Sequence, residues 1–393
     1  MSSIFCRWVA SLFGTLLFSV TALQAGEAAN PLVGPWGELV IRSIVLKPPL
    51  PFLEDFCEGT PPFEYWSFPV GGVGKLDRLL RELKVPVDML PSLLSKTECS
   101  SEQERCVVFP SDEDLLYLPP DARRELYAYL AQRDSVGGFF YTKYFRAYRW
   151  PIELSARIQF REHFDLPPRD FENFLHLLYP EGRYYVFSDF ELMCRLLSDG
   201  GVRVRFFQDI VASHALLVYL KIDASSDIDA ITAYWDRGNR LKQIRPLLSS
   251  LKPKNPKEAI LLDIVHLLPP YPRQKLNTFS DPGASFQPDC HHTAYNFFRA
   301  DTGIEMVSAD RFVQLLSKDY TMILEEDFET GKPIVPKGMK EIPKKEFGDL
   351  VLFVHSDLKV IHAANVIAGD IVFTKNGASP RRPFVLMRMD VLK

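Results

Sequence analysis

The sequence predicts an α+β protein in which a mainly helical region precedes a helix and an antiparallel sheet. Residues 75–275 repeatedly place leucines at helical spacing, with charges between them. Four short apolar segments with strand-like alternation follow residue 348 and are joined by turn pairs such as Gly369–Asp370. Helices and strands that are segregated along the chain are typical of the α+β class.

The composition excludes several classes of protein. The chain has 393 residues, of which 47% are hydrophobic and 24% charged, as in folded soluble proteins. A disordered chain, a collagen and a multi-span membrane protein are therefore excluded. The net charge of -4 provides no overall basic field, so we expect no nucleic-acid partner. Thirty prolines predict many short elements instead of a few long ones.

Residues 1–25 have the pattern of a secretory signal peptide. Arg7 precedes a run from Trp8 to Val20 without ionisable side chains, and the small Ala25 fits the last residue removed. The run is shorter than the about 20 apolar residues of a transmembrane helix. An uncleaved N-terminal anchor is the alternative. We expect an exported protein, periplasmic or extracellular, with no transmembrane segment after signal cleavage.

Export bears on the cysteines, because disulfides form in oxidising compartments. Five cysteines follow the predicted signal: Cys57, Cys99, Cys106, Cys194 and Cys290. This odd number leaves at least one thiol unpaired. Cys99 and Cys106 bracket a short polar loop and are the expected disulfide, whereas a Cys57–Cys194 pair is left open by the sequence. Cys290 is the odd cysteine on chemical grounds.

After the signal, the chain is expected to have three parts. Residues 30–74 are Pro-rich and aromatic, which suggests an extended strap on the domain surface or, alternatively, a linker. Residues 75–279 form a mainly helical domain whose role the sequence does not indicate. The composition becomes turn-rich near residue 280, and residues 280–393 form the final domain.

Helical periodicity marks five segments of the second part: Lys75–Lys84, Arg123–Gln132, Asp170–Leu178, Asp189–Leu197 and Ala230–Leu241. Two apolar runs, Tyr184–Phe187 and Ala215–Ile222, are too short to be assigned to helix or strand. The sequence Leu-Pro-Pro begins at Leu118, Leu166 and Leu268. Because proline is tolerated in the first turn of a helix, each occurrence predicts a helix start.

The final domain is expected to contain one helix and a four-stranded meander. The strands are expected at Asp349–His355, Val360–Ala368, Asp370–Lys375 and Pro383–Met389. Strands that are joined by such short turns must be antiparallel.

The strongest chemical signal is the segment Gln287–Phe298. Asp289 is a candidate helix N-cap, which places Cys290 in the first turn. There, free backbone N–H groups and the helix dipole favour a thiolate. A nucleophilic thiol needs a base, most often histidine, and His362 in the second predicted strand is the candidate. Alternation places His362 on one face of the sheet with the small Ala364.

These features resemble a family of cysteine hydrolases. A cysteine at a helix start, the sequence Gly348-Asp349-Leu350-Val351-Leu352-Phe353, and a following strand with His362 are similar to NlpC-type cell-wall peptidases and their CHAP amidase relatives. The resemblance covers residues 280–393 and implies a papain-like helix packed on an antiparallel sheet.

The resemblance also implies roles for individual residues. Cys290 would be the nucleophile and His362 the general base, oriented by a polar residue one strand later. Thr374 fits this third role by strand position and Asn376 by chemistry, since an amide can hold a histidine tautomer. We favour Asn376.

The sequence departs from the family at two places. The aromatic-Trp-Gly-Gly stretch that usually precedes the cysteine is absent, and His291–His292 follows it where a small Ser-Gly pair is usual. These two adjacent histidines are expected at a solvated helix end, with a position of one of them near Cys290 as the alternative. Because of these departures, the resemblance does not indicate which groups form the oxyanion hole or which class of substrate is bound.

The predicted function is an exported amidase or endopeptidase that cleaves an amide bond in cell-wall peptide, or transfers its acyl group. Its partner would be a peptide or peptidoglycan substrate, and no cofactor is expected. A non-catalytic envelope scaffold or binding protein with the hydrolase fold is the main alternative. A zinc site is less favoured, because no histidine pair at helical spacing and no Cys-x-x-Cys occurs.

Overall fold

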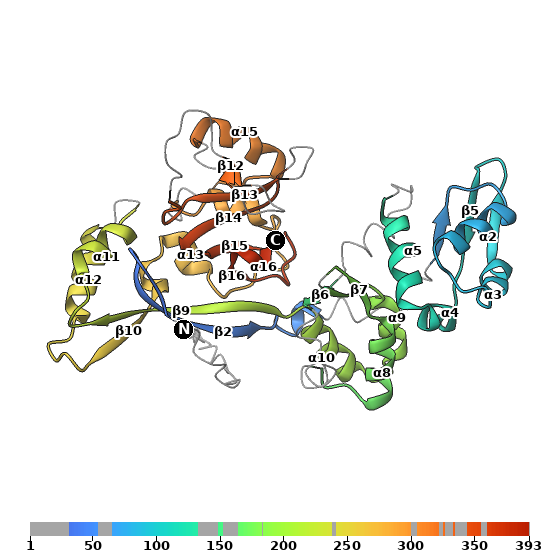
Figure 1. The fold of residues 1–393 in the computed structure, drawn as a ribbon, viewed down its shortest axis with the longest axis horizontal. Coiled ribbons are helices and arrows are strands. Elements are labelled where there is room, and N and C mark those ends of the chain that lie inside the picture. The colour runs from blue at the N-terminus through green and yellow to red at the C-terminus, as the bar shows by residue number, and fades with distance from the viewer. Residues whose placement is uncertain are drawn as a thin grey trace, which may run out of the picture. The chain divides into compact units, whose positions relative to one another are not determined.

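The computed structural model describes residues 31–53, 65–132, 148–151, 164–182, 184–237, 241–299, 305–321, 325–326, 333–334, 344–354 and 360–392. The predicted signal peptide and Cys57 lie outside these ranges. The chain forms two compact units, one of residues up to 44 with residues 216–266 and one of residues 45–215 with 267–393. Helices occur together with antiparallel sheets, which confirms the α+β class (Figure 1). Among the described residues, no helix has the length and apolarity to span a bilayer.

The first unit is centred on a four-stranded sheet. Its order is β1 (Leu32–Gly34), β2 (Gly37–Leu46), β9 (Ser213–Asp223) and β10 (Ala259–Asp263). The start of the predicted strap is therefore a β-hairpin, and one of the two unassigned apolar runs is strand β9. Trp235 is fully buried and donates its indole N–H to the Trp36 carbonyl at 3.0 Å, which ties helix α11 to the hairpin.

One predicted helix is wrong in this unit. The sequence pattern suggested a single helix over Ala230–Leu241, whereas the structure has α11 (Ile228–Trp235) and α12 (Leu241–Leu251). A turn at Asp236–Arg237 follows α11. The leucine periodicity therefore continued across a turn.

The N-terminal part of the second unit is mixed, not only helical. Its helices are α2 (Val73–Glu82), α3 (Leu90–Ser95), α4 (Asp112–Tyr117), α5 (Pro120–Gln132), α8 (Pro168–Leu177), α9 (Phe190–Leu196) and α10 (Gly200–Ile210). Two three-stranded sheets are added: β3 (Trp66–Phe68), β5 (Arg105–Val108) and β4 (Thr97–Ser100), and β6 (Tyr148–Pro151), β8 (Tyr184–Phe187) and β7 (Tyr179–Glu181). Buried side chains such as Trp66 and Phe174 form one apolar core from both sheets and these helices.

The three Leu-Pro-Pro sequences start helices, as predicted. Helices α5, α8 and α13 (Pro270–Lys275) each begin at the second proline. In two of them an arginine folds back onto the leucine carbonyl: Arg123 Nη2 lies 3.1 Å from Leu118 O, and Arg273 Nε lies 3.2 Å from Leu268 O. The repeated sequence is therefore a local helix-start motif, because the arginine satisfies a carbonyl that precedes the helix.

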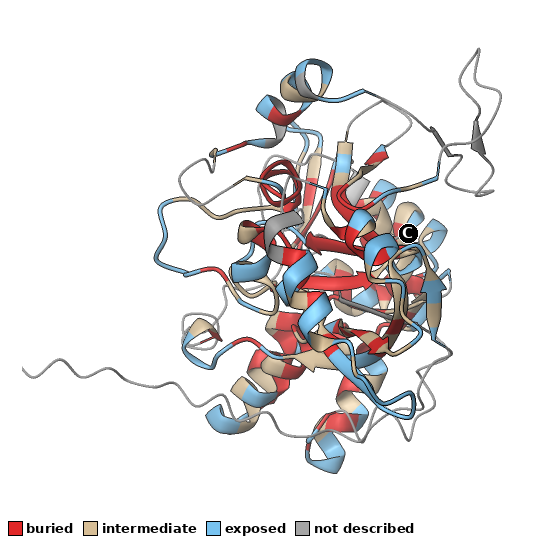
Figure 2. Ribbon diagram, turned by 90° about the vertical axis from the view of Figure 1, so that its left-hand side faces the viewer, coloured by how far each residue is buried: buried red, intermediate tan, exposed pale blue. Residues whose placement is uncertain are grey.

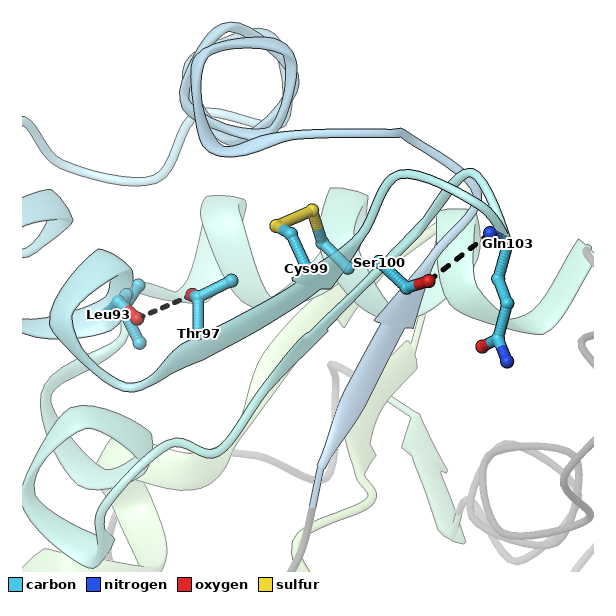
Figure 3. The surroundings of a disulfide bond; sticks show 6 residues. Leu93, Thr97, Cys99, Ser100 and Gln103 are labelled. Carbon is cyan, nitrogen blue, oxygen red and sulfur yellow. Dashed lines mark hydrogen bonds between the residues drawn. A yellow bond between two sulfur atoms is a disulfide. The ribbon is translucent and has the colours of Figure 1, made fainter.

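The predicted disulfide between Cys99 and Cys106 is confirmed. The two residues are directly opposite in the β4–β5 hairpin, and the bond joins them across it (Figure 3). Thr97 Oγ1 donates to Leu93 O at 2.9 Å on one side, and Gln103 N donates to Ser100 Oγ at 3.2 Å in the loop. The covalent link therefore joins two strands that are also held by a hydrogen bond to α3 and by one within the loop.

The C-terminal part holds the predicted meander. Strands β13 (Leu350–Val354), β14 (Val360–Ala368), β15 (Ile371–Lys375) and β16 (Phe384–Arg388) pair antiparallel in chain order, orange to red in Figure 1. Their bounds confirm the four predicted strands. Strands β14 and β15 are buried along most of their length, and Figure 2 maps this burial over the described chain. The remaining elements are η2 (Ile264–Leu267), α14 (Cys290–Tyr295), α15 (Ala309–Asp319), β11 (Glu325–Glu326), β12 (Pro333–Ile334) and α16 (Met389–Leu392).

Gly348, which lies two residues before β13, is required by close packing. Its φ is +82°, and a Cβ atom there would lie 2.2 Å from Phe298 Cζ. The backbone N–H of Gly348 donates to Val366 O at 2.7 Å. Because glycine alone tolerates both this φ and this contact, the segment after α14 can meet the first strand of the sheet.

Candidate active site

Helix α14 begins at Cys290, as the sequence predicts. The Asp289 carboxylate accepts the His292 backbone N–H at 2.9 Å and so caps the helix. The Asp289 carbonyl also accepts the Thr293 hydroxyl at 2.6 Å. This cap fixes the backbone around Cys290, whose side chain is buried, with 4% of the residue exposed.

Apolar packing places this helix on the sheet. Ala294 of α14 belongs to a buried cluster with Phe312 of α15 and Ala363 of β14. Further along, the Phe297 ring lies 6.0 Å from that of Phe373 in β15. Helix α14 therefore packs against β14 and β15, the strands that carry the other candidate residues.

His362 is oriented by Thr374. The Thr374 hydroxyl lies 2.9 Å from His362 Nε2 and 3.0 Å from the Ala363 carbonyl. A hydroxyl has one hydrogen, and the carbonyl can only accept, so this hydrogen is donated to Ala363. The hydroxyl oxygen consequently accepts from His362, which places a proton on Nε2 and leaves Nδ1 for other contacts.

Cys290 and His362 are brought together. Burial by itself raises the pKa of the Cys290 thiol, but hydrogen bonds and charges from His291 and His362 outweigh it and lower the pKa to about 6. Because Nε2 of His362 is engaged by Thr374, Nδ1 is the ring nitrogen that remains for the sulfur. Cys290, His362 and Thr374 therefore supply a thiol, an imidazole and a hydroxyl that orients the imidazole.

Asn376, favoured for the third role from its chemistry, lies elsewhere. Its amide nitrogen is 3.9 Å from the Met387 sulfur. Strand β15 ends at Lys375, and Gly377 with a φ of +82° turns the chain immediately afterwards. The polar contact to His362 comes instead from Thr374, the residue that strand position favoured.

The expectation of a solvated pair of histidines is wrong, since His291 and His292 are both buried. His291 Nδ1 lies 3.9 Å from Cys290 Sγ and 3.4 Å from Asp289 Oδ2. Burial tends to lower the pKa of His291, but Asp289 and Cys290 outweigh it and raise the pKa to about 10. The sequence feature that indicates this contact is the position of His291 directly after Cys290, at the start of a helix that Asp289 caps.

His292 has a different environment. Burial lowers its pKa to about 4, and its Nδ1 lies 3.5 Å from both Val307 N and Asn296 Nδ2. It is therefore a neutral histidine that accepts from the backbone near α15. The two neighbouring histidines differ in protonation because only His291 faces a carboxylate and a thiol.

Lys375 adds a positive charge near the site. Its side chain is fully buried, and Nζ donates to Gly377 O at 2.8 Å and Ser379 O at 2.9 Å. Burial lowers its pKa to about 8, although the negative charges of Asp289 and Cys290 act in the opposite direction. These contacts hold the turn after β15 and keep a basic group within electrostatic reach of the thiol.

The described part of the chain contains no group of three or more histidine, cysteine, aspartate or glutamate side chains that could hold a metal ion. Comparison with protein-family models, curated proteins and solved structures finds no significant match to this chain. The resemblance to NlpC-type and CHAP enzymes therefore stays a prediction that depends on the residues themselves.

Proposed function

We propose that the C-terminal part of this protein is a cysteine hydrolase in which Cys290 is the nucleophile and His362 the general base. The observation that carries this proposal is a thiol whose pKa is lowered to about 6 beside an imidazole that a buried hydroxyl holds in place. Lowered thiol pKa values are typical of catalytic cysteines, whereas buried structural cysteines are inert.

The chemistry follows from the positions of the protons. The Cys290 thiolate attacks a substrate carbonyl carbon, and a sulfur–carbon bond forms. The protonated His362 gives its Nδ1 proton to the leaving amine, and the amide C–N bond breaks to leave a thioester. Neutral His362 then takes a proton from water, whose oxygen attacks the thioester carbon. The carbon–sulfur bond breaks, the acid is released, and the Cys290 thiolate and protonated His362 are restored.

Thr374 is a positioning residue in this scheme. By accepting the Nε2–H bond it keeps the Nδ1 side of His362 toward the sulfur in both protonation states. This is the task of an orienting carboxylate or amide in other cysteine and serine hydrolases, here performed by a hydroxyl.

The substrate we propose is an amide bond in cell-wall peptide, and export through a signal peptide is part of this proposal. The support is the resemblance of residues 280–393 to NlpC-type and CHAP enzymes, together with the disulfide between Cys99 and Cys106, since such bonds persist in oxidising compartments. If an amine replaces water as acceptor, the same thioester leads to acyl transfer.

The test is cleavage of isolated peptidoglycan by the purified protein, with released peptides followed by mass spectrometry. Cys290→Ala should abolish release. Cys194→Ala is the matched control, because it removes another buried cysteine on a different helix, and should keep full activity. Full activity of the Cys290→Ala protein would refute the proposal.

A non-catalytic envelope scaffold is the second candidate, and the near-complete burial of Cys290 favours it, because a substrate must reach the sulfur. In that case wild-type and Cys290→Ala proteins should bind peptidoglycan equally and release nothing. Pelleting with sacculi measures this binding alongside the cleavage assay.

A further inference from the structure

We propose that His291, held by Asp289, is a second imidazole partner of the Cys290 sulfur, so that the resting thiolate does not depend on His362 alone. This inference rests on the proposed cysteine hydrolase and adds a division of labour to it: His291 stabilises the charge on sulfur, and His362 moves the proton.

The geometry assigns His291 to the sulfur and the carboxylate together. A single ring nitrogen, Nδ1, faces both Cys290 Sγ at 3.9 Å and Asp289 Oδ2 at 3.4 Å. The other nitrogen, Nε2, is buried and has no hydrogen-bond partner among the described residues. The ring packs on Phe312 of α15, with centroids 4.9 Å apart. All polar contacts of this imidazole are therefore directed to the start of α14.

Asp289 is positioned independently of His291. Its Oδ1 accepts the His292 backbone N–H at 2.9 Å as the helix cap, which leaves Oδ2 for His291. A carboxylate this close to a thiolate would repel it unless a positive charge lay between or beside them. A protonated His291 supplies that charge and is adjacent to both anions.

Several charged groups act on the sulfur from the elements packed around it. His291 at the start of α14, His362 in β14 and Lys375 in β15 interact with the sulfur, and Asp289 acts on His291 and Lys375. Burial acts to raise the pKa of the Cys290 thiol, and hydrogen bonds and charges from both His291 and His362 outweigh it and lower the pKa to about 6. Removal of either histidine should therefore leave part of the thiolate stabilisation in place.

This arrangement separates two functions that one histidine performs in a simple Cys–His pair. Loss of His362 should stop turnover, because His362 is the proposed acid and base, whereas the polar contacts of His291 are with Asp289 and the sulfur. The thiolate itself should survive, since His291 still faces it. Loss of His291 should instead raise the pKa of the Cys290 thiol, while His362 remains to move the proton.

The experiment measures the pH dependence of Cys290 alkylation by iodoacetamide, followed on the Cys290 peptide by mass spectrometry. The proteins are wild type, His291→Asn, His362→Ala and the double variant. His292→Asn is the matched control, because it changes a buried histidine of the same helical turn whose Nδ1 contacts lie at Val307 and Asn296. Circular dichroism confirms that each variant is folded, and His291→Gln replaces His291→Asn if the latter is not.

The wild-type midpoint is expected near pH 6. His291→Asn should raise it by about one unit or more, and His362→Ala should leave it below the about 8.5 of an ordinary thiol. The double variant should reach or exceed that value, because burial by itself raises the thiol pKa. His292→Asn should not move it. An unchanged midpoint in His291→Asn, with His362→Ala alone at about 8.5, would overturn the inference and leave the proposed hydrolase intact. A wild-type midpoint near 8.5 would overturn both.

Discussion

Replacement of Thr374 by valine tests the orienting role most directly. Valine keeps the shape of threonine but removes the hydroxyl that accepts from His362 Nε2. The Thr374 side chain is fully buried, so no water is expected to replace this acceptor. A buried N–H group without a partner costs about 1 to 3 kcal/mol.

This free energy sets the size of the effect. If the penalty acts on the orientation of His362 in the transition state, kcat falls by roughly 5- to 150-fold, since each 1.36 kcal/mol is about tenfold in rate. The KM should change little, because Thr374 contacts no substrate in the proposed scheme. Thr374→Ser keeps the hydroxyl and should retain most of the activity.

The assay is the steady-state rate of peptide release from peptidoglycan, with Asn376→Ala as the comparison. Its amide contacts the Met387 sulfur, so this variant should lose less than about twofold. A larger loss in Asn376→Ala than in Thr374→Val would refute the reasoning and return the third role to Asn376.

Three further predictions follow from single contacts. Cys290 should be alkylated at half its plateau rate near pH 6, where an ordinary thiol of pKa about 8.5 is below about 1% of its plateau, as measured by peptide mass spectrometry. Replacement of both Cys99 and Cys106 by serine should lower the free energy of unfolding by about 2 to 3 kcal/mol in urea titrations, because the bond closes a loop with a sequence separation of 7; an unchanged midpoint would contradict this. Burial lowers the pKa of Lys375 from 10.5 to about 8, so the folded protein binds fewer protons than the unfolded chain between these pH values. The free energy of unfolding relative to Lys375→Met should therefore rise across this range, by up to about 3 kcal/mol, and a fall would contradict the burial of a charged amine.

The sequence by itself determined the features that depend on near neighbours. Alternating apolar residues and two-residue turns located the four strands of the meander, because both signals lie within about ten residues of chain. The Leu-Pro-Pro helix starts and the Cys99–Cys106 disulfide were also predictable, since proline geometry and a short loop act locally. The cap at Asp289 placed Cys290 at the start of its helix for the same reason.

Only the tertiary structure decided between residues that local patterns cannot separate. Thr374 and Asn376 share one face by strand alternation, and the end of β15 at Lys375 determines which of them meets His362. His291 is buried because Phe312, from a helix later in the chain, covers it, and no pattern near His291 indicates that contact. Burial and charge pairing arise from segments distant in sequence, and these long-range contacts set the protonation of the site.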